Sequence, residues 1–377
     1  MRIAHVAPFF LPVIGGWEEA IHRISVELAP KGFEFTVLTC DELHDRSKIG
    51  KRLEIIDGIT VKRFPVIARV SSFYRLWPGF TKELKGFDVV HAHNFRHPHV
   101  DLCALNKKKY GYKLVLRSGS PFHPKSMALW ALRRLYDSAI AGYSFGKTDQ
   151  LLAYHGFEAA RFKAMGFPEE KISVIPFGVG KEFFEPGNAQ EFREKHGIGQ
   201  DFVLNIGRMH HYKNLEVLIR AMVLAPKETD LVLLGGGEKR YVDSLKKLAR
   251  ELGLMDRTHF VPATRDKTEL RGALAACELF VLPSVYEPFG MVVLEAMAQA
   301  KAVIATCFDG PSAVIDEGET GMLFRPDSVG QLSEKINYLL SNKSVCKKIG
   351  LRARQKAMDY TWDKIAAMVE KVYRGLC

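Results

Sequence analysis

The stretch Glu287-Pro-Phe-Gly-Met-Val-Val-Leu-Glu295 carries two glutamates separated by seven residues. The apolar run 279–283 before it predicts a buried strand, and residues 290–300 predict a helix. Glu287 then lies in the loop at the helix mouth, where free backbone N–H groups and the positive end of the helix dipole favour an oxygen-rich ligand. Glu295 is expected about two turns inside this apolar helix. Either a solvent-facing polar stripe or a ligand explains a glutamate there.

Two series of alternating strands and helices extend outward from this segment. In the first half, strands are predicted at 2–7, 34–40, 59–64, 88–92, 113–118, 150–154 and 172–175, and helices at 17–30, 99–110, 126–145 and 156–165. In the second half, strands are predicted at 202–207, 230–234, 258–262, 279–283, 302–306 and 322–324, and helices at 213–225, 239–252, 267–276, 290–300, 328–341 and 344–359. Repeated strand–helix units predict parallel sheets covered on both faces, with ligand loops at the carboxyl ends of the strands. We expect an α/β protein with two Rossmann-like, doubly wound domains that face a cleft.

Composition agrees with a two-domain enzyme, because 377 residues with 47% hydrophobic and 26% charged residues suffice for two cores. The six cysteines form no Cys-x-x-Cys pair, so we expect reduced packing residues and no zinc site or disulfide framework. The amino terminus is already strand-like, which argues against a secretory signal. The apolar stretch 127–145 is interrupted by charges, so it should not span a bilayer. We expect a cytoplasmic protein.

Glycines follow strands at two places. Gly15 and Gly16 end the loop after the first strand and open a helix, which lets the backbone approach an anionic phosphate closely. A plain turn is the alternative interpretation. The cluster Gly235-Gly-Gly237 lacks the spacing of a dinucleotide fingerprint or a Walker loop, so it is interpreted as a tight turn that borders a nucleotide.

Two permanent cations, Arg208 and Lys213, follow the strand 202–207 and precede a helix. Cations at this spacing suit a diphosphate leaving group, because charge builds on that group as its bond to carbon breaks. Ordinary surface charges on a loop are the alternative.

His91 and His93 alternate on one strand, so both side chains are predicted on the same face of the sheet. His93, at the carboxyl end of the strand, is well placed to donate a hydrogen bond to a sugar hydroxyl. A core histidine followed by an edge residue is the alternative.

Glu-Pro-Phe-Gly with its second glutamate, followed by Ala-Met-Ala, resembles the signature of family 4 retaining glycosyltransferases, which have the GT-B fold. Other motifs of that family occur in the same order along essentially the whole chain: Gly15-Gly16-Trp17-Glu18, His91-Ala-His93, Val174-Ile-Pro-Phe-Gly-Val179, and Gly207-Arg208 with Lys213. The resemblance implies an acceptor-binding domain, 1–176 plus a returning C-terminal helix 362–377, and a domain that binds a nucleotide-sugar donor, 177–361.

The resemblance also implies roles for single residues. Gly16 lies against the donor diphosphate, and His93 lies near a distal hydroxyl of the sugar. Glu287 and the backbone N–H groups of Phe289, Gly290 and Met291 hold the transferred sugar. Glu295 binds the ribose hydroxyls, and the loop 263–267, which includes Arg265, contacts the base.

The implied reaction is hexosyl transfer with retention of configuration. No Asp-x-Asp pair occurs in the chain, so Arg208 and Lys213 are expected to replace a metal ion at the diphosphate, and no cofactor or metal site is predicted. With no evident enzymatic nucleophile, front-face attack is favoured, in which the leaving phosphate accepts the proton of the acceptor.

Basic residues concentrate in the first domain. Residues 1–176 contain 26 Lys and Arg against 17 Asp and Glu, a net charge of +9, whereas 177–377 carry +2. A solvated surface is one interpretation. The other is contact with a phosphorylated or lipid-linked acceptor, or with the anionic inner face of a membrane, aided by the apolar residues of 128–145. Nucleic-acid binding is not expected, because no aromatic stacking motif interleaves with the basic residues.

Two departures from the family pattern leave the acceptor open. Phe177 and Gly180 stand where asparagine and aspartate are frequent, and Ser118-Gly119 replaces a Thr-x-His-Gly-like segment. Two other classes remain as alternatives to a transferase of glycolipid or polysaccharide synthesis. One is a GT-B nucleotide-sugar epimerase, and the other is a sugar-nucleotide-binding protein that has lost catalysis.

Overall fold

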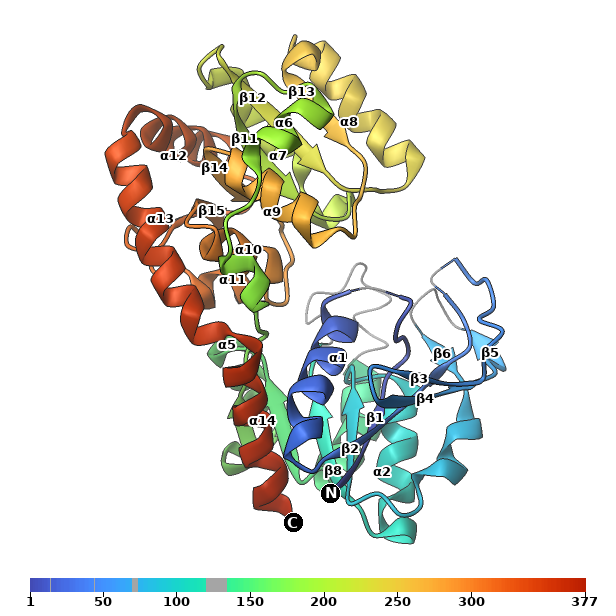
Figure 1. Cartoon of the computed structure of the whole chain (residues 1–377). Helices are drawn as coiled ribbons and strands as arrows, with labels where there is room; N and C mark the ends of the chain where they lie inside the picture. The colour runs from blue at the N-terminus through green and yellow to red at the C-terminus, as the bar shows by residue number, and fades with distance from the viewer. Residues whose placement is uncertain (14, 44, 70–73, 120–133) are drawn as a thin grey trace. The chain divides into compact units, whose positions relative to one another are not determined.

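The computed structural model describes residues 1–13, 15–43, 45–69, 74–119 and 134–377, and the chain divides into two compact units. The first unit is Met1–Phe177 with Trp362–Cys377, and the second is Gly178–Thr361 (Figure 1). The predicted domain boundaries, after 176 and after 361, lie within one residue of these. The acceptor-binding and donor-binding roles stay predictions.

The first unit is built on a sheet of order β10-β9-β8-β7-β1-β2-β4-β3, in which β3 alone is antiparallel to its neighbour among the described strands. Its strands are β1 (Arg2–Val6), β2 (Glu34–Cys40), β3 (Leu53–Ile56), β4 (Ile59–Phe64), β7 (Val89–His93), β8 (Lys113–Arg117), β9 (Gln150–Ala153) and β10 (Ile172–Val174). The short strands β5 (Ala68–Arg69) and β6 (Arg75–Leu76) pair separately. The helices are α1 (Gly16–Leu28), α2 (Pro98–Tyr110), α4 (Gly142–Lys147), α5 (Gly156–Ala164) and α14 (Trp362–Leu376).

Helices cover both faces of this sheet. Successive side chains of a β-strand point to opposite faces, so each face carries apolar residues that a helix can bury. Ala4 and Val6 of β1 join a buried apolar cluster with Cys103 of α2. The opposite face of the sheet meets α14, where Tyr373 contacts His91 of β7. Helix α14 also packs along α1, so the last helix of the chain completes the first unit (Figure 1).

The second unit has a fully parallel described sheet of order β13-β12-β11-β14-β15-β16. Its strands are β11 (Asp201–Ile206), β12 (Thr229–Leu234), β13 (Thr258–Val261), β14 (Leu279–Leu282), β15 (Ala302–Thr306) and β16 (Met322–Phe324). Its helices are α6 (Ala189–His196), α7 (Leu215–Ala221), α8 (Lys239–Glu251), α9 (Lys267–Ala276), α10 (Met291–Ala298), α11 (Asp309–Val314), α12 (Val329–Ser341) and α13 (Lys343–Ala357). Buried aliphatic residues on one face of the strands join a cluster with α7, α8, α12 and α13, and helices α9 and α10 also contact strands of this sheet.

The predicted α/β fold class is confirmed, and all thirteen predicted strands occur within about two residues of their expected ends. The sequence reasoning missed β3, β5, β6, α6 and α11. The predicted helix 213–225 occurs as α7 followed by the 3₁₀ turn Met222–Leu224, and it starts two residues later than predicted. Asn214 has a left-handed backbone, with φ of 54°, which separates the 3₁₀ turn His211–Lys213 from α7. The predicted helix 126–145 falls partly on 126–133, outside the described residues, and its remainder is helical.

Candidate functional site

The predicted donor-site residues of the second unit follow the carboxyl ends of its strands, so they lie at one edge of its sheet. The neighbouring strands β11 and β14 are parallel, so the loops that follow them start side by side. Lys213 lies in the loop after β11, and Glu287 lies in the loop after β14. A backbone hydrogen bond of 3.0 Å from Val285 N–H to the Tyr212 carbonyl joins the two loops.

Lys213 and Glu287 form an ion pair, in which the Lys213 ammonium donates to Glu287 Oε2. Both side chains are only 14% exposed, so solvent screens this pair less than a surface pair. An ammonium has three N–H donors, and the contact with Glu287 occupies one of them. The remaining donors can bind an anionic oxygen while the carboxylate holds the cation in place.

The loop that carries Glu287 is supported from behind by the start of α11. Gly290 is the N-cap of α10 and has a left-handed backbone, with φ of 86°. The amide of Gly310 donates a 3.2 Å hydrogen bond to the Glu287 carbonyl. Gly310 lies so close that an added Cβ would be 2.2 Å from Phe289 Cα. Glycine at position 310 is therefore a packing requirement of the Glu287 loop, which the sequence reasoning missed.

The loop that carries Arg208 packs on the glycine cluster after β12. Met209 donates a 2.8 Å backbone hydrogen bond to the Gly236 carbonyl, and Cβ atoms at Gly235 or Gly237 would lie 1.9 Å from the Gly207 oxygen or 2.2 Å from the Met209 oxygen. Because glycine has no Cβ, the backbone of the loop after β11 can lie directly against the backbone of the glycine cluster. Their first role is thus loop-to-loop packing, whereas contact with a nucleotide stays a prediction. Arg208 itself is exposed.

The remaining predicted residues of the second unit lie near the same edge of the sheet. Phe289 and Gly290 are buried before α10, Met291 is its first residue, and Glu295 is half-buried on its second turn. Arg265 is exposed in the loop after β13, and Ala263 of that loop lies 3.7 Å from a Cβ built on Gly236. The edge therefore combines cations, carboxylates and the amino end of a helix.

In the first unit, Gly15 is the N-cap of α1 and Gly16 is its first residue, so this glycine pair opens a helix, as predicted. The following Trp17 side chain lies against Gly119, whose added Cβ would be 3.1 Å from the indole ring. Glycine at 119 thus makes room for this ring. The sequence reasoning treated position 119 only as a departure from the family pattern.

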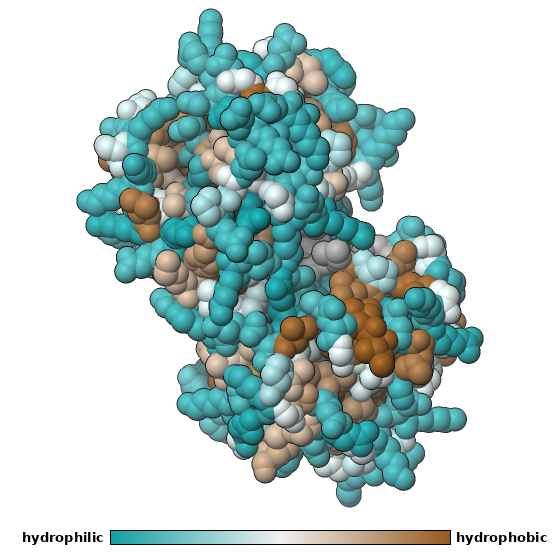
Figure 2. Space-filling model, viewed as in Figure 1, coloured by the Kyte–Doolittle hydropathy of each residue, from teal (hydrophilic) through white to brown (hydrophobic). Residues whose placement is uncertain are grey.

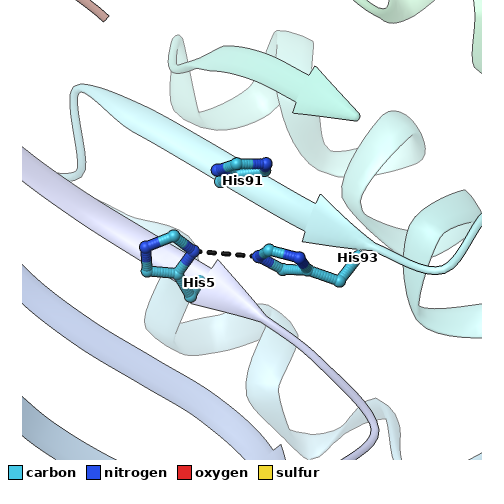
Figure 3. A group of neighbouring side chains, drawn as sticks. All are labelled: His5, His91 and His93. Atoms are coloured by element: carbon cyan, nitrogen blue, oxygen red, sulfur yellow. Dashed lines mark hydrogen bonds between the residues drawn. The ribbon is translucent and has the colours of Figure 1, made fainter. Parts of the chain in front are cut away.

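His93 is the last residue of β7 and is buried, so the alternative of an exposed edge residue is wrong. Its Nε2 lies 2.9 Å from Nδ1 of His5 on β1, and its ring stacks on His91 at a centroid distance of 4.4 Å (Figure 3). Burial, followed by the charges of neighbouring groups, lowers the pKa of His93 well below its usual value. His93 is therefore neutral near pH 7. His5 was missed, although its place on a neighbouring parallel strand was a usable signal.

The stretch predicted to contact a membrane is only partly described. Leu135, Ile140 and Tyr143 are 65%, 41% and 45% exposed, while 128–133 lie outside the described residues. On the visible face of the molecule, apolar residues gather over part of the first unit and polar residues cover most of the second (Figure 2). None of the described helices is long and apolar enough to cross a bilayer. Membrane contact and the inner-face location stay predictions.

Comparison with known families assigns both halves of the chain. Residues 14–183 match the family described as Glycosyltransferase Family 4, and residues 188–356 match glycosyl transferases group 1. The D-inositol 3-phosphate glycosyltransferase of Corynebacterium glutamicum is 30% identical, over 99% of this chain and 96% of that protein. An uncharacterized glycosyltransferase of Methanocaldococcus jannaschii is 26% identical, over 99% of this chain and 98% of that protein. The chain belongs to glycosyltransferase family 4 and is a glycosyltransferase.

Solved structures agree on the fold. The Anabaena protein HepE, determined in complex with UDP, matches with a TM-score of 0.82 and 20% identity over 100% of both chains. Sucrose-phosphate synthase of Thermosynechococcus elongatus matches with a TM-score of 0.80 and 20% identity over 100% of this chain and 98% of that chain. The predicted GT-B fold is confirmed.

The contact between Gly310 and Phe289 generates a prediction. Gly310→Ala places a methyl group against the backbone of Phe289, which can shift only at a cost in free energy. The variant should therefore lower the free energy of unfolding by roughly 1–3 kcal/mol and displace the Glu287 loop. Chemical denaturation measures the first effect, and calorimetric titration with a nucleotide-sugar donor, compared with the free nucleotide, measures the second.

Gly330→Ala is the matched control, because a Cβ at this position of α12 meets nothing within 4 Å. Alanine stabilises a helix relative to glycine by roughly 0.5–1 kcal/mol, so this variant should be neutral or more stable. Equal stability of the two variants would show that the contact at Gly310 is not a constraint.

Proposed function

We propose that this glycosyltransferase moves a hexose from a nucleotide-diphosphate sugar to an acceptor hydroxyl with retention of configuration and without a metal ion at the diphosphate. The observation that carries the proposal is the ion pair between Lys213 and Glu287 beside the amino end of α10. HepE has been determined with UDP and with UDP-glucose, which supports a nucleotide-sugar donor here. Absence of Asp-x-Asp from the sequence supports a diphosphate held by protein cations.

In this proposal Lys213 and Arg208 stabilise the leaving nucleoside diphosphate. Negative charge grows on the phosphate as the sugar–oxygen bond breaks, so fixed cations stabilise the transition state more than the bound donor. The contact with Glu287 aims the Lys213 ammonium before the donor arrives. A cation held in place needs little reorganisation during the reaction, which is the main requirement of electrostatic catalysis.

The two carboxylates bind different parts of the donor. Glu287 and the N–H groups of residues 289–291 hold the hydroxyls of the sugar, and Glu295 binds the ribose. Gly15 and Gly16 admit the diphosphate at the start of α1, and Arg265 lies beside the base. His93, as a neutral imidazole, forms one hydrogen bond with a sugar hydroxyl.

Retention follows from attack on the face that the leaving group vacates. The bond from the anomeric carbon to the phosphate oxygen breaks, and the acceptor oxygen bonds to the same face of that carbon. The acceptor proton moves to the departing phosphate oxygen, so no enzymatic base is required. The net charge of +9 on residues 1–176 supports a phosphorylated or lipid-linked acceptor in glycolipid or glycoconjugate synthesis.

Calorimetric titration with UDP-, GDP- and ADP-sugars tests the donor class, and we expect one nucleotide to bind more tightly than the others. Donor incubated alone should stay unchanged apart from slow hydrolysis. Formation of an epimerised nucleotide sugar would replace the transferase proposal with an epimerase, and no binding of any nucleotide sugar would favour a protein that has lost catalysis.

The role of the cation predicts the effect of Lys213→Ala. This variant should lower turnover by roughly 10²–10³-fold, the scale for losing one preorganised group that stabilises a transition state. Added Mg²⁺ should neither be required by the parent enzyme nor restore the variant. Lys335→Ala is the control, since Lys335 is also paired with a glutamate, Glu317, but lies outside the site. Full activity of Lys213→Ala would refute the assignment.

The different roles of the two carboxylates predict different effects on nucleotide affinity in two variants. Glu295→Gln should weaken the binding of free nucleoside diphosphate as well as donor. Glu287→Gln should leave free nucleotide affinity within a few-fold of the parent and mainly lower the rate of sugar transfer. Equal losses of nucleotide affinity in the two variants, measured by calorimetry, would contradict this division.

A further inference from the structure

Three imidazoles meet on two neighbouring strands of the first unit, apart from the cations and carboxylates described above. His5 on β1 lies directly opposite His91 on β7 in the parallel register, and His93 follows two residues later on the same face. The His5 ring centroid lies 5.1 Å from both other rings (Figure 3). The three side chains are 0%, 1% and 5% exposed. The register of the strands, and not a flexible loop, thus fixes this cluster.

The hydrogen bonds of the cluster are incomplete. His5 Nδ1 and His93 Nε2 are 2.9 Å apart, so one ring donates a proton to the other. Nε2 of His5 and Nε2 of His91 are buried and have no hydrogen-bond partner among the described residues. A buried polar atom without a partner costs roughly 1–3 kcal/mol, so the unpartnered Nε2 of His91 indicates that the cluster can take up a bound species. Nε2 of His5 carries the proton of its ring when Nδ1 accepts.

Burial favours the neutral form of all three rings. Burial lowers the pKa of His5 to about 3, and burial together with neighbouring positive groups lowers those of His91 and His93 well below the ordinary value. All three rings therefore offer lone pairs near pH 7, and a neutral imidazole is the form that coordinates metal ions.

Tyr373 of α14 orients one ring. Its hydroxyl oxygen lies 2.6 Å from His91 Nδ1. When Nδ1–H donates to this oxygen, the lone pair of His91 is on Nε2, the atom without a partner. A second hydrogen bond that fixes the tautomer in this way is the usual companion of a metal-bound histidine.

We propose that His5, His91 and His93 bind one transition-metal ion, with Zn²⁺ as the representative of the ions that prefer imidazole. One ligand atom from each side chain lies within 4.8 Å of the others. Tetrahedral zinc with bonds of about 2.0–2.1 Å requires nitrogens roughly 3.4 Å apart, so small ring rotations would open the 2.9 Å pair and close the wider ones. The ion replaces the proton shared by His5 and His93.

One nearby charge opposes the ion. Arg117 is buried and is among the causes of the low pKa values of His91 and His93. Its guanidinium lies over the Tyr154 ring at 4.3 Å and donates to the Pro176 carbonyl, so protein groups already stabilise part of its charge. We therefore expect weaker affinity than in a site with four protein ligands. Three ligands also leave a fourth position for a small molecule such as water.

The bound ion would act on the first unit and not on the donor diphosphate. It would join β1 to β7 and, through Tyr373, strengthen the docking of α14 on the sheet. Coordination of His93 through Nε2 would leave its proton on Nδ1, so this ring could still donate to a sugar hydroxyl. Binding of the ion is independent of the proposed sugar transfer and can be measured without an activity assay.

The experiment uses the full-length, untagged, reduced protein, stripped with a chelator and titrated with Zn²⁺ against a chromophoric competitor. We expect one ion per chain and a higher midpoint of thermal unfolding. X-ray absorption should show nitrogen ligands at about 2.0–2.1 Å and no sulfur at about 2.3 Å. Sulfur ligation would assign the binding to exposed thiols such as Cys307 and Cys377 and overturn the proposal.

Variants locate the ion. His5→Gln and His91→Gln should abolish the tight stoichiometric binding, and Tyr373→Phe should weaken it by roughly 10–100-fold while keeping all three ligands. His22→Gln is the control, because His22 pairs with Asp57 elsewhere in the same unit and should bind zinc like the parent. If the ligand variants fail to fold, Tyr373→Phe decides the question. Unchanged affinity in Tyr373→Phe, or loss of binding in His22→Gln, would refute the site.

Discussion

The parallel register of the two sheets is the constraint on which the rest of the structure depends. Parallel strands end at one edge, so residues far apart in the chain meet wherever their strands are neighbours. Lys213 and Glu287 are 74 residues apart and form an ion pair because β11 lies beside β14. In the same way, His5 meets His91 and His93 because β1 lies beside β7. One principle of construction thus creates both the donor edge and the histidine cluster.

Glycine has a second structural role at the donor edge. The family motif draws attention to the glycines next to phosphate, but several glycines here admit another backbone. Gly235 and Gly237 receive the loop of Arg208, and Gly310 receives the loop of Glu287. The charged side chains consequently lie on loops that pack tightly against neighbouring backbone. This arrangement favours catalysis by fixed charges, because a preorganised cation loses less free energy to reorganisation than a mobile one.

The two units differ in how they treat polar groups. At the edge of the second sheet, opposite charges are paired and partly exposed, so an incoming anion can compete for them. In the core of the first unit, imidazoles are held neutral by burial, which penalises their charged form. Tyr373 links that core to α14, although α14 follows the whole second unit in sequence. The first unit is therefore completed only when the end of the chain has returned.

The sequence by itself determined the alternating strands and helices, the α/β class and the family, because buried parallel strands and their glycine-rich loops leave local patterns. It also located Lys213 and Glu287, because each of them lies in a short local motif of its own. Only the tertiary structure decided that these two form an ion pair, that Gly310 supports Phe289, and that His93 is buried with His5. Those facts depend on strand order and on the close approach of distant backbones, and no local periodicity encodes either. The edge strand β3 was missed for a related reason: its alternate Leu53 and Ile55 are exposed, so its pattern does not mark a buried strand.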